Sequence, residues 1–258
     1  KGVNAQICNV LELVHKNILI PQKQTIKKLT TYAPSQAVDG IKKALFSIGG
    51  GTIGNYQECS FISEGTATFK GNEHSNPVIG SKGVSQTTSE VMISMTFAKH
   101  LEKNIISALH GAHPYEEVAF EITTLDNKNQ HIGMGMIAEL ENPMSEDAFL
   151  MYLKEKMNTD CIRHSKKTNK PIKKVAVLGG SGSFAINDAI AQGADVYVTS
   201  DLKYHDFYTA ENKILLADIG HYESEQYTKE LLHTYLTKKI TNFAVVLSKT
   251  NTNPVKYF

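Results

Sequence analysis

The sequence predicts an α/β domain with a mostly parallel sheet, interrupted by an inserted α+β domain. Short, fully apolar stretches such as Val175–Leu178 alternate with helical patterns, which is typical of strands buried in a parallel sheet. Residues 27–125 instead follow the order strand, helix, strand, strand, helix, strand, which is that of a ferredoxin-like split βαβ unit. We therefore expect an α/β domain at residues 1–24 and 129–258 and an α+β ferredoxin-like domain at residues 25–128.

The elements of the inserted domain follow from periodicity and turn residues. In the clearest strand pattern, alternate apolar residues from Val91 to Phe97 share one face. Apolar residues after Pro34 recur at helical spacing until Gly49–Gly51 end the helix. The predicted elements, in order, are a strand at 29–32, a helix from 34 to 48, strands at 59–70 and 91–97, a helix at 98–110 and a strand at 118–125.

The remaining elements belong to the α/β domain. An apolar stripe predicts a first helix at residues 1–14, and Ser145, followed by two acidic residues, is the expected N-cap of another. The predicted elements, in order, are a helix at 1–14, a strand at 133–140, a helix after 145, a polar loop at 163–173, strands at 175–178 and 196–199 separated by a helix at 184–192, a short helix at 206–211, a strand at 215–219, a helix at 222–239 and a strand at 243–247.

Composition excludes several classes of protein. The chain has 258 residues and a formal net charge of +1, which gives no support for nucleic acid or an anionic membrane as an obligate partner. Its three cysteines form no CxxC pair, so neither a disulfide framework nor a cysteine-based zinc site is expected. No apolar run is long enough for a membrane helix, and the start at Lys1 does not resemble a signal peptide. We expect a cytoplasmic protein whose natural sequence begins before Lys1.

The segment from Leu216 to Glu225 contains the first candidate site. A buried strand delivers His221 past Gly220 to the carboxyl edge of the sheet, where α/β proteins place their ligands. Glu225 follows four residues later and would share a helix face with His221. Imidazole and carboxylate together suit Zn, Mn, Fe or Ni better than Mg alone. A solvated His/Glu pair at a helix start is the alternative interpretation, but the location favours half of a metal site.

A second polar cluster, Thr199–Asp206, also follows a buried strand. His205 near a metal is a candidate general acid or base, and Asp201 is a neighbouring carboxylate. The alternative is an ordinary polar loop in which Asp206 caps the helix that follows.

Two further segments allow two interpretations each. Gly180–Ala185 fits the G-x-G-x-x-[GA] pattern between a strand and a helix, which is typical of a dinucleotide site. A lone fingerprint is weak evidence, however, and a tight turn that needs glycine for close packing is the favoured interpretation. His113–Glu117 is either a functional segment or a rigid turn with surface charge, because Pro114 biases His113 toward extended backbone.

Together these segments resemble one family, the GTP cyclohydrolase 1 type 2 homologues, also called the NIF three-like proteins. The resemblance runs in order through nearly the whole chain. The matching stretches are Gly54–Tyr56, Cys59–Gly65, Asn76–Gly80, His113–Glu117, Gly179–Gly182, Thr199–Asp206 and Asp218–Glu225.

The resemblance implies a NIF three-like α/β domain with an inserted ferredoxin-like domain, two divalent metal ions per subunit and a ring-shaped homohexamer. His221 and Glu225 match two of the family's metal ligands, and His205 matches a histidine that lines the site. Family members carry a His-His pair and an Asp before the helix that Gly2–Asn4 resembles. We therefore expect residues upstream of Lys1 to complete the site, and the 258-residue chain alone to bind metal weakly.

The expected function is a metal-dependent, hydrolase-like activity on an unidentified nucleotide or phosphorylated small molecule. Two metal ions ~3.5–4 Å apart can activate water and hold a phosphoryl group. The alternative is a non-catalytic metal-binding scaffold or regulatory protein, in which the inserted domain senses a ligand or partner.

Overall fold

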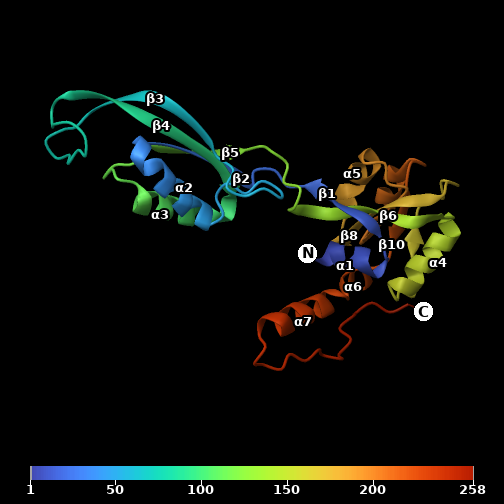
Figure 1. The fold of residues 1–258 in the computed structure, drawn as a ribbon. Coiled ribbons are helices and arrows are strands. Elements are labelled where there is room, and N and C mark those ends of the chain that lie inside the picture. Colours follow the sequence, from blue (N-terminus) through green and yellow to red (C-terminus); the bar gives the residue numbers. More distant parts are fainter. Residues whose placement is uncertain (1, 258) are drawn as a thin grey trace. The chain divides into compact units, whose positions relative to one another are not determined.

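The computed structural model describes residues 2–257, and the chain divides into two compact units (Figure 1). The first unit consists of Lys1–Pro21 and Gln130–Phe258, and the second is Gln22–Asn129. Each unit has its own sheet and its own hydrophobic core. The second unit is therefore an insertion between two neighbouring strands of the first.

A six-stranded mixed sheet forms the centre of the first unit, in the order β1-β6-β8-β9-β10-β7. Only the β8–β9 and β9–β10 pairs are parallel, so the prediction of a mostly parallel sheet is wrong. The chain leaves this sheet at the end of β1 and returns at the start of the adjacent β6, where Pro21 pairs with Gly133, so the two strands are antiparallel. The strands are β1 (Val14–Pro21), β6 (Gly133–Met144), β7 (Arg163–His164), β8 (Ile172–Ser181), β9 (Val196–Ser200) and β10 (Leu215–Asp218).

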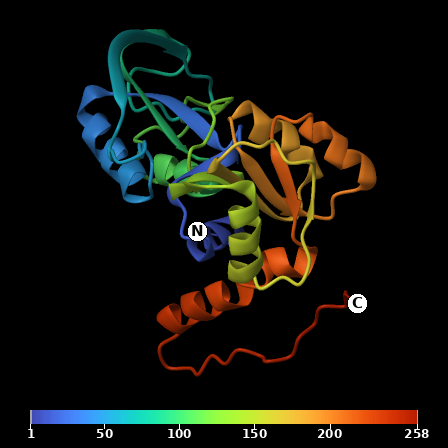
Figure 2. The ribbon, with the colours of Figure 1, turned by 90° about the vertical axis from the view of Figure 1, so that its right-hand side faces the viewer.

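Helices cover both faces of this sheet (Figure 2). On β8, Val175 and Val177 pack into one core with α1 and α4, whereas Ala176 and Leu178 pack into a second core with α5. Alternate residues of a strand point to opposite faces, which explains why its apolar run is continuous. The helices are α1 (Val3–Val10), α4 (Glu146–Lys156), α5 (Ile186–Ala191), α6 (His221–Glu225) and α7 (Thr228–Lys239), with short 3-10 helices η3 (Ser183–Ala185) and η4 (Tyr204–Ala210).

Local signals placed some boundaries well and others badly. Ser145 is the N-cap of α4 and accepts a hydrogen bond from the Ala148 N–H at 3.3 Å, as predicted. The first helix is shorter than predicted, because Val14 already belongs to β1 and pairs with β6. The predicted helix at 222–239 is divided into α6 and α7.

The strand predicted at 243–247 is not formed. Phe243 and Val246 are 71% and 83% exposed, so the apolar residues that suggested a strand have no sheet to pack against. The backbone carbonyl of Val245 instead lies 3.1 Å from His233 Nε2 of α7. An alternating pattern predicts a strand only where a partner strand is within reach.

The second unit is a four-stranded antiparallel sheet in the order β3-β4-β2-β5, with α2 and α3 packed on one face. Val91, Ile93, Met95 and Phe97 share the face under these helices, as their alternation predicted. The elements are β2 (Ile26–Ala33), the 3-10 helix η1 (Ser35–Ala37), α2 (Val38–Ser47), β3 (Phe61–Lys70), β4 (Ser85–Ala98), the 3-10 helix η2 (Lys99–Leu101), α3 (Glu102–Ala112) and β5 (Phe120–Leu125).

The isolated segment Gln22–Asn129 is expected to fold cooperatively, because its core is formed within the segment. Urea unfolding followed by far-UV circular dichroism checks this. Ile93 is completely buried, so Ile93→Ala should lower the free energy of unfolding by about 2–5 kcal/mol. A gradual, non-cooperative transition of the unsubstituted segment would contradict the expectation.

Candidate metal centre

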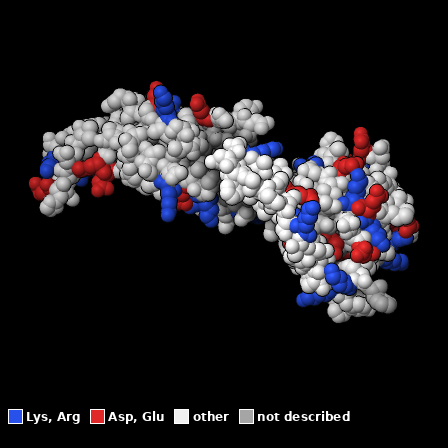
Figure 3. Space-filling model, turned by 90° about the horizontal axis from the view of Figure 1, so that it is seen from below, with Lys and Arg blue, Asp and Glu red and all other residues white. Residues whose placement is uncertain are grey.

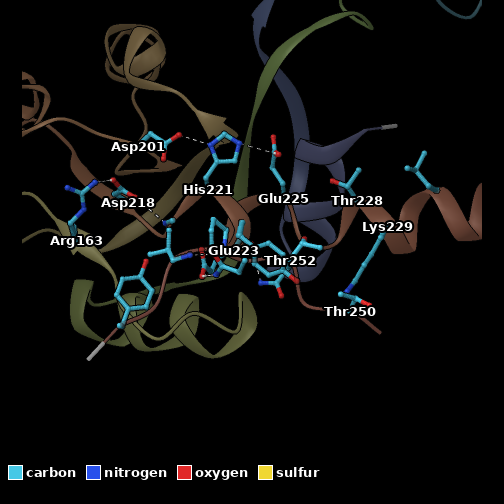
Figure 4. A pocket seen from close by; sticks show the side chains of 18 residues that line it. Arg163, Asp201, Asp218, His221, Glu223, Glu225, Thr228, Lys229, Thr250 and Thr252 are labelled. Atoms are coloured by element: carbon cyan, nitrogen blue, oxygen red, sulfur yellow. Dashed lines mark hydrogen bonds and ion pairs between the residues drawn. The ribbon is translucent and has the colours of Figure 1, made fainter. Parts of the chain in front are cut away.

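The site lies where the parallel strands β8, β9 and β10 end. Asp201 follows β9, Asp218 ends β10, and Gly220 leads into α6, which begins at His221 (Figure 4). Gly220 has φ 89°, a backbone conformation that side-chain-bearing residues rarely adopt. This glycine allows the chain to turn sharply from the strand into the helix, so that His221 stands at the sheet edge.

His221 is held between two carboxylates (Figure 4). Its Nδ1 lies 2.6 Å from Asp201 Oδ2, and its Nε2 lies 3.4 Å from Glu225 Oε2. The hydroxyl of Ser181, at the end of β8, donates to the same oxygen of Asp201. The three strand ends therefore cooperate to orient one imidazole ring.

These contacts shift two pKa values. The hydrogen bond with Asp201, opposed by partial burial, raises the pKa of His221. For Asp201, partial burial opposes ionisation, but hydrogen bonds from His221 and Ser181 outweigh it and lower the pKa. Asp201 is therefore an anion that accepts the Nδ1–H of His221. In the neutral form of His221, this tautomer leaves the Nε2 lone pair available to a metal on the side of Glu225.

The arrangement fits a metal in donor type and spacing. Two ligands at zinc–nitrogen and zinc–oxygen distances of ~2.0–2.1 Å in tetrahedral geometry lie ~3.3 Å apart, and the Nε2–Oε2 separation is 3.4 Å. A metal-ligating histidine usually donates its other N–H to a carboxylate, which is the position of Asp201. The number of ligands does not suffice, since residues 2–257 contain no group of three or more His, Cys, Asp or Glu side chains placed to hold a metal ion.

Asp218 has a structural task beside this site. It is 3% exposed and accepts hydrogen bonds from the Leu202 N–H at 2.9 Å and the Gly220 N–H at 3.1 Å. It also forms an ion pair with Arg163 of β7. Asp218 thus connects the loop after β9 to the turn before α6.

A cavity of about 820 Å³ opens beside His221 and Glu225. Arg163 and Lys229 line it, together with residues of the C-terminal segment Thr250–Tyr257. Asn253 of that segment donates to the buried Glu223 carboxylate at 2.8 Å. The cavity therefore combines the candidate metal ligands His221 and Glu225 with two cationic side chains, Arg163 and Lys229.

The glycine segment Gly179–Gly182, at the end of β8, makes hydrogen bonds and packing contacts within the protein. The Gly179 N–H donates to Asn4 Oδ1 at 2.8 Å, and the Gly180 N–H donates to Ser224 Oγ at 2.9 Å. A Cβ atom on Gly182 would lie 2.1 Å from Thr199 Oγ1, so close packing requires glycine there. Both N–H groups and the space at Gly182 thus serve contacts within the protein, which favours the structural interpretation of this turn.

Titration calorimetry of the chain with NAD, NADP and FAD is consequently expected to show no binding. The N–H groups of Gly179 and Gly180 are bonded to Asn4 and Ser224, and Gly182 is required for close packing against Thr199. Micromolar affinity for any of the three would restore the dinucleotide interpretation.

His205 is not brought to the cavity. It lies exposed on η4, with its ring against those of Tyr204 and Tyr208, at centroid distances of 5.2 and 6.3 Å. Asp206 accepts the Lys203 N–H at 2.7 Å, so it caps η4, as the structural alternative proposed.

Sequence reasoning missed the roles of Asp218, Arg163 and Glu223. Asp218 carried a weak signal, since it is a charged residue at the end of an apolar strand pattern. Arg163 lay in a segment interpreted as a loop, and its partner is 55 residues away along the chain. Such a pairing has no local pattern to reveal it.

With this geometry established, comparisons with known proteins identify the family. The family model described as Duf34/NIF3 (NGG1p interacting factor 3) matches residues 1–254. The chain belongs to the Duf34/NIF3 family. The resemblance noted in the sequence is thereby confirmed.

Similar Duf34/NIF3 proteins agree in sequence and in fold. A Bacillus subtilis (strain 168) protein named GTP cyclohydrolase 1 type 2 homolog is 35% identical over 269 residues, which cover 99% of this chain and 70% of the relative. A Staphylococcus epidermidis protein of the same name is 32% identical over 261 residues, which cover 100% of this chain and 71% of the relative. The crystal structure of a Bacillus cereus protein related to NIF3 gives a TM-score of 0.82 at 33% identity, covering all of this chain and 70% of that one.

Two surface observations complete the description of this Duf34/NIF3 chain. Within residues 2–257, every helix is too short or too polar to span a membrane. On the face shown in Figure 3, lysine and arginine side chains lie interspersed with acidic ones. This mixture agrees with the formal net charge of +1.

Proposed function

We propose that this Duf34/NIF3 protein binds divalent metal through His221 and Glu225 and hydrolyses a nucleotide or another phosphorylated small molecule. The observation that carries the proposal is the separation of 3.4 Å between His221 Nε2 and Glu225 Oε2, beside a cavity of about 820 Å³. The relatives named GTP cyclohydrolase 1 type 2 homolog support a nucleotide as the substrate class.

Each side chain has a proposed task. His221 and Glu225 hold the metal, and Asp201 orients His221 through Nδ1. A bound metal would supply activation of water and stabilisation of negative charge on a phosphoryl group. Arg163 and Lys229 line the cavity and would bind substrate phosphates, because guanidinium and ammonium groups are strong donors to phosphate oxygens.

His205 remains the candidate for proton transfer. Its ring is exposed on η4, four residues after Asp201, so it can exchange protons with solvent or with a substrate that extends beyond the cavity.

The wider assembly is part of the same proposal. We propose two metal ions per subunit, of the Zn, Mn, Fe or Ni class, in a cytoplasmic homohexamer. We also propose that the inserted unit is a ferredoxin-like domain, which its strand order β3-β4-β2-β5 and its two helices on one face support.

A turnover assay tests the proposal. Chelator-treated protein is incubated with GTP and a panel of nucleotides and phosphate esters, with and without added Zn²⁺ or Mn²⁺, and products are separated by chromatography. We expect metal-dependent hydrolysis, and His205→Ala should lower kcat by about 10²–10⁴-fold at unchanged metal content. Metal binding without any metal-dependent turnover would instead favour the non-catalytic scaffold or regulatory protein.

A further inference from the structure

The inserted unit contains a cavity of about 600 Å³, separate from the candidate metal centre. Its floor lies on the sheet face opposite α2 and α3. Glu90 on β4 points to the opposite face of the sheet from the buried Val91 and Ile93. Its partner on β3 is Gly65, and Ala67 and Phe69 lie further along β3 on the same face. The volume lies within the range of ~300–1,000 Å³ that small-molecule sites occupy.

Two chain segments form the walls of this cavity and are bonded to each other. One is Asn72–Ile79, beyond the end of β3, and the other is Tyr115–Ala119, before β5. The Glu116 carboxylate accepts the backbone N–H of Asn76 at 2.5 Å. The cavity is therefore held in shape by a side-chain contact between its walls.

The His113–Glu117 segment positions the polar end of the cavity. His113 is buried; its Nδ1 accepts the Tyr115 N–H at 3.1 Å, so its Nε2 donates to the Tyr32 carbonyl at 2.9 Å. This fixed turn aims the Tyr115 hydroxyl at Glu90 Oε1, 2.7 Å away. Burial and the neighbouring Glu90 raise the pKa of Tyr115, so the phenol keeps its proton and donates.

Glu90 is the side chain that points to a ligand. It is 7% exposed and lines the cavity, yet among residues 2–257 its Oε2 accepts no hydrogen bond and its carboxylate has no cationic partner within 4.0 Å. Glu90 Oε2 is not fully buried, so this unpartnered oxygen faces the cavity, where it can contact a bound ligand. Tyr115 supplies one neutral donor, which leaves room for a positive group.

The lining selects the sign and size of the ligand. Three glutamates, Glu90, Glu116 and Glu117, face one lysine, Lys70. The charged side chains of the lining therefore carry a net negative charge, which repels anionic ligands. A bare metal ion needs several oxygen ligands around one point, and residues 2–257 contain no such group of three. Apolar lining residues extend the site beyond its charged end, and they include Ala67, Phe69, Pro77, Val78 and Ile79.

We propose that this cavity binds a small organic cation, with its ammonium or guanidinium group at Glu90 and its apolar part against Phe69 and Ile79. The site would bind its ligand without acting on it chemically. The proposal does not depend on the metal centre, because the cavity lies within Gln22–Asn129.

Three probes of similar size test the proposal with the complete chain in EDTA, so that metal bound elsewhere plays no part. Phenethylammonium carries the cation, phenethyl alcohol is its neutral counterpart, and phenylpropionate is an anion. Titration followed by ligand-observed NMR should give at least tenfold tighter binding of phenethylammonium than of the other two. Glu90→Gln should abolish this preference, because the amide keeps an acceptor for Tyr115 but loses the charge.

Glu64→Gln is the matched control, since Glu64 is an exposed glutamate on β3 outside the cavity lining, and it should leave affinity unchanged. If Glu90→Gln lowers the melting temperature, Glu117→Gln provides the charge test at an exposed position and should weaken phenethylammonium several-fold. Failure of phenethylammonium to bind, equal affinity for charged and neutral probes, or displacement of the probe by stoichiometric Ca²⁺ in a parallel titration from which EDTA has been dialysed away would overturn the proposal.

Discussion

Replacing both His221 and Glu225 with alanine is expected to weaken Zn²⁺ or Mn²⁺ binding by at least about 100-fold. Loss of a residue that merely orients a metal ligand typically costs 10–100-fold in affinity, and this variant removes the two proposed ligands themselves. The Nε2 and Oε2 atoms lie 3.4 Å apart, which is the spacing of two ligands on one zinc ion. Competition with a chromogenic chelator measures the affinity directly.

The control for this experiment removes the same side-chain types elsewhere. Glu73 and His74 are both exposed and lie outside the candidate metal centre, so the Glu73→Ala/His74→Ala variant should bind metal as the unsubstituted chain does. Asp201→Asn should fall between the two, because it loses charge at the atom that orients His221. Unchanged metal affinity in the correctly folded His221/Glu225 variant would exclude these residues as ligands.

Asp218→Ala is expected to lower the free energy of unfolding by about 2–4 kcal/mol. The substitution leaves the N–H groups of Leu202 and Gly220 without their acceptor in a region where Asp218 is 3% exposed. The ion pair with Arg163 contributes less, because the guanidinium side chain is 56% exposed and solvent screens it. Urea unfolding at neutral pH measures the change.

Two further variants separate the causes. Arg163→Ala should cost below about 1 kcal/mol, since both backbone hydrogen bonds to Asp218 survive. Asp147→Ala removes an exposed aspartate, paired with Lys167, and should also cost below about 1 kcal/mol. If Asp218→Ala costs no more than Asp147→Ala, the two backbone hydrogen bonds do not stabilise the site as we infer.

Much of the fold followed from local pattern. The alternation from Val91 to Phe97 placed one face of β4 correctly, and Ser145 marked the start of α4. These predictions succeeded because side-chain periodicity and helix capping are decided within one turn or one strand. The strand expected at 243–247 had the same kind of pattern and failed, because a strand also needs a partner.

The candidate metal centre was likewise predictable only where its contacts are local in the sequence. His221 and Glu225 were found together because four residues on one helix bring their side chains to one face. Asp201 stood out as polar at a strand end, but its contact with His221 depends on β9 and β10 being parallel neighbours. His205 had an equally suggestive position in the sequence; the structure places its ring against Tyr204 and Tyr208, and its catalytic role stays a prediction.

The sequence by itself determined the family, the order of most helices and strands, and the two donors on α6. Only the tertiary structure decided that the large sheet is mixed, that Asp201 orients His221, and that Glu90 lies in a cavity with one oxygen unpartnered. The reason is physical. Helix faces, caps and turns depend on residues a few positions apart, whereas strand direction, ligand orientation and the compensation of a buried charge depend on groups that meet only after the chain has folded.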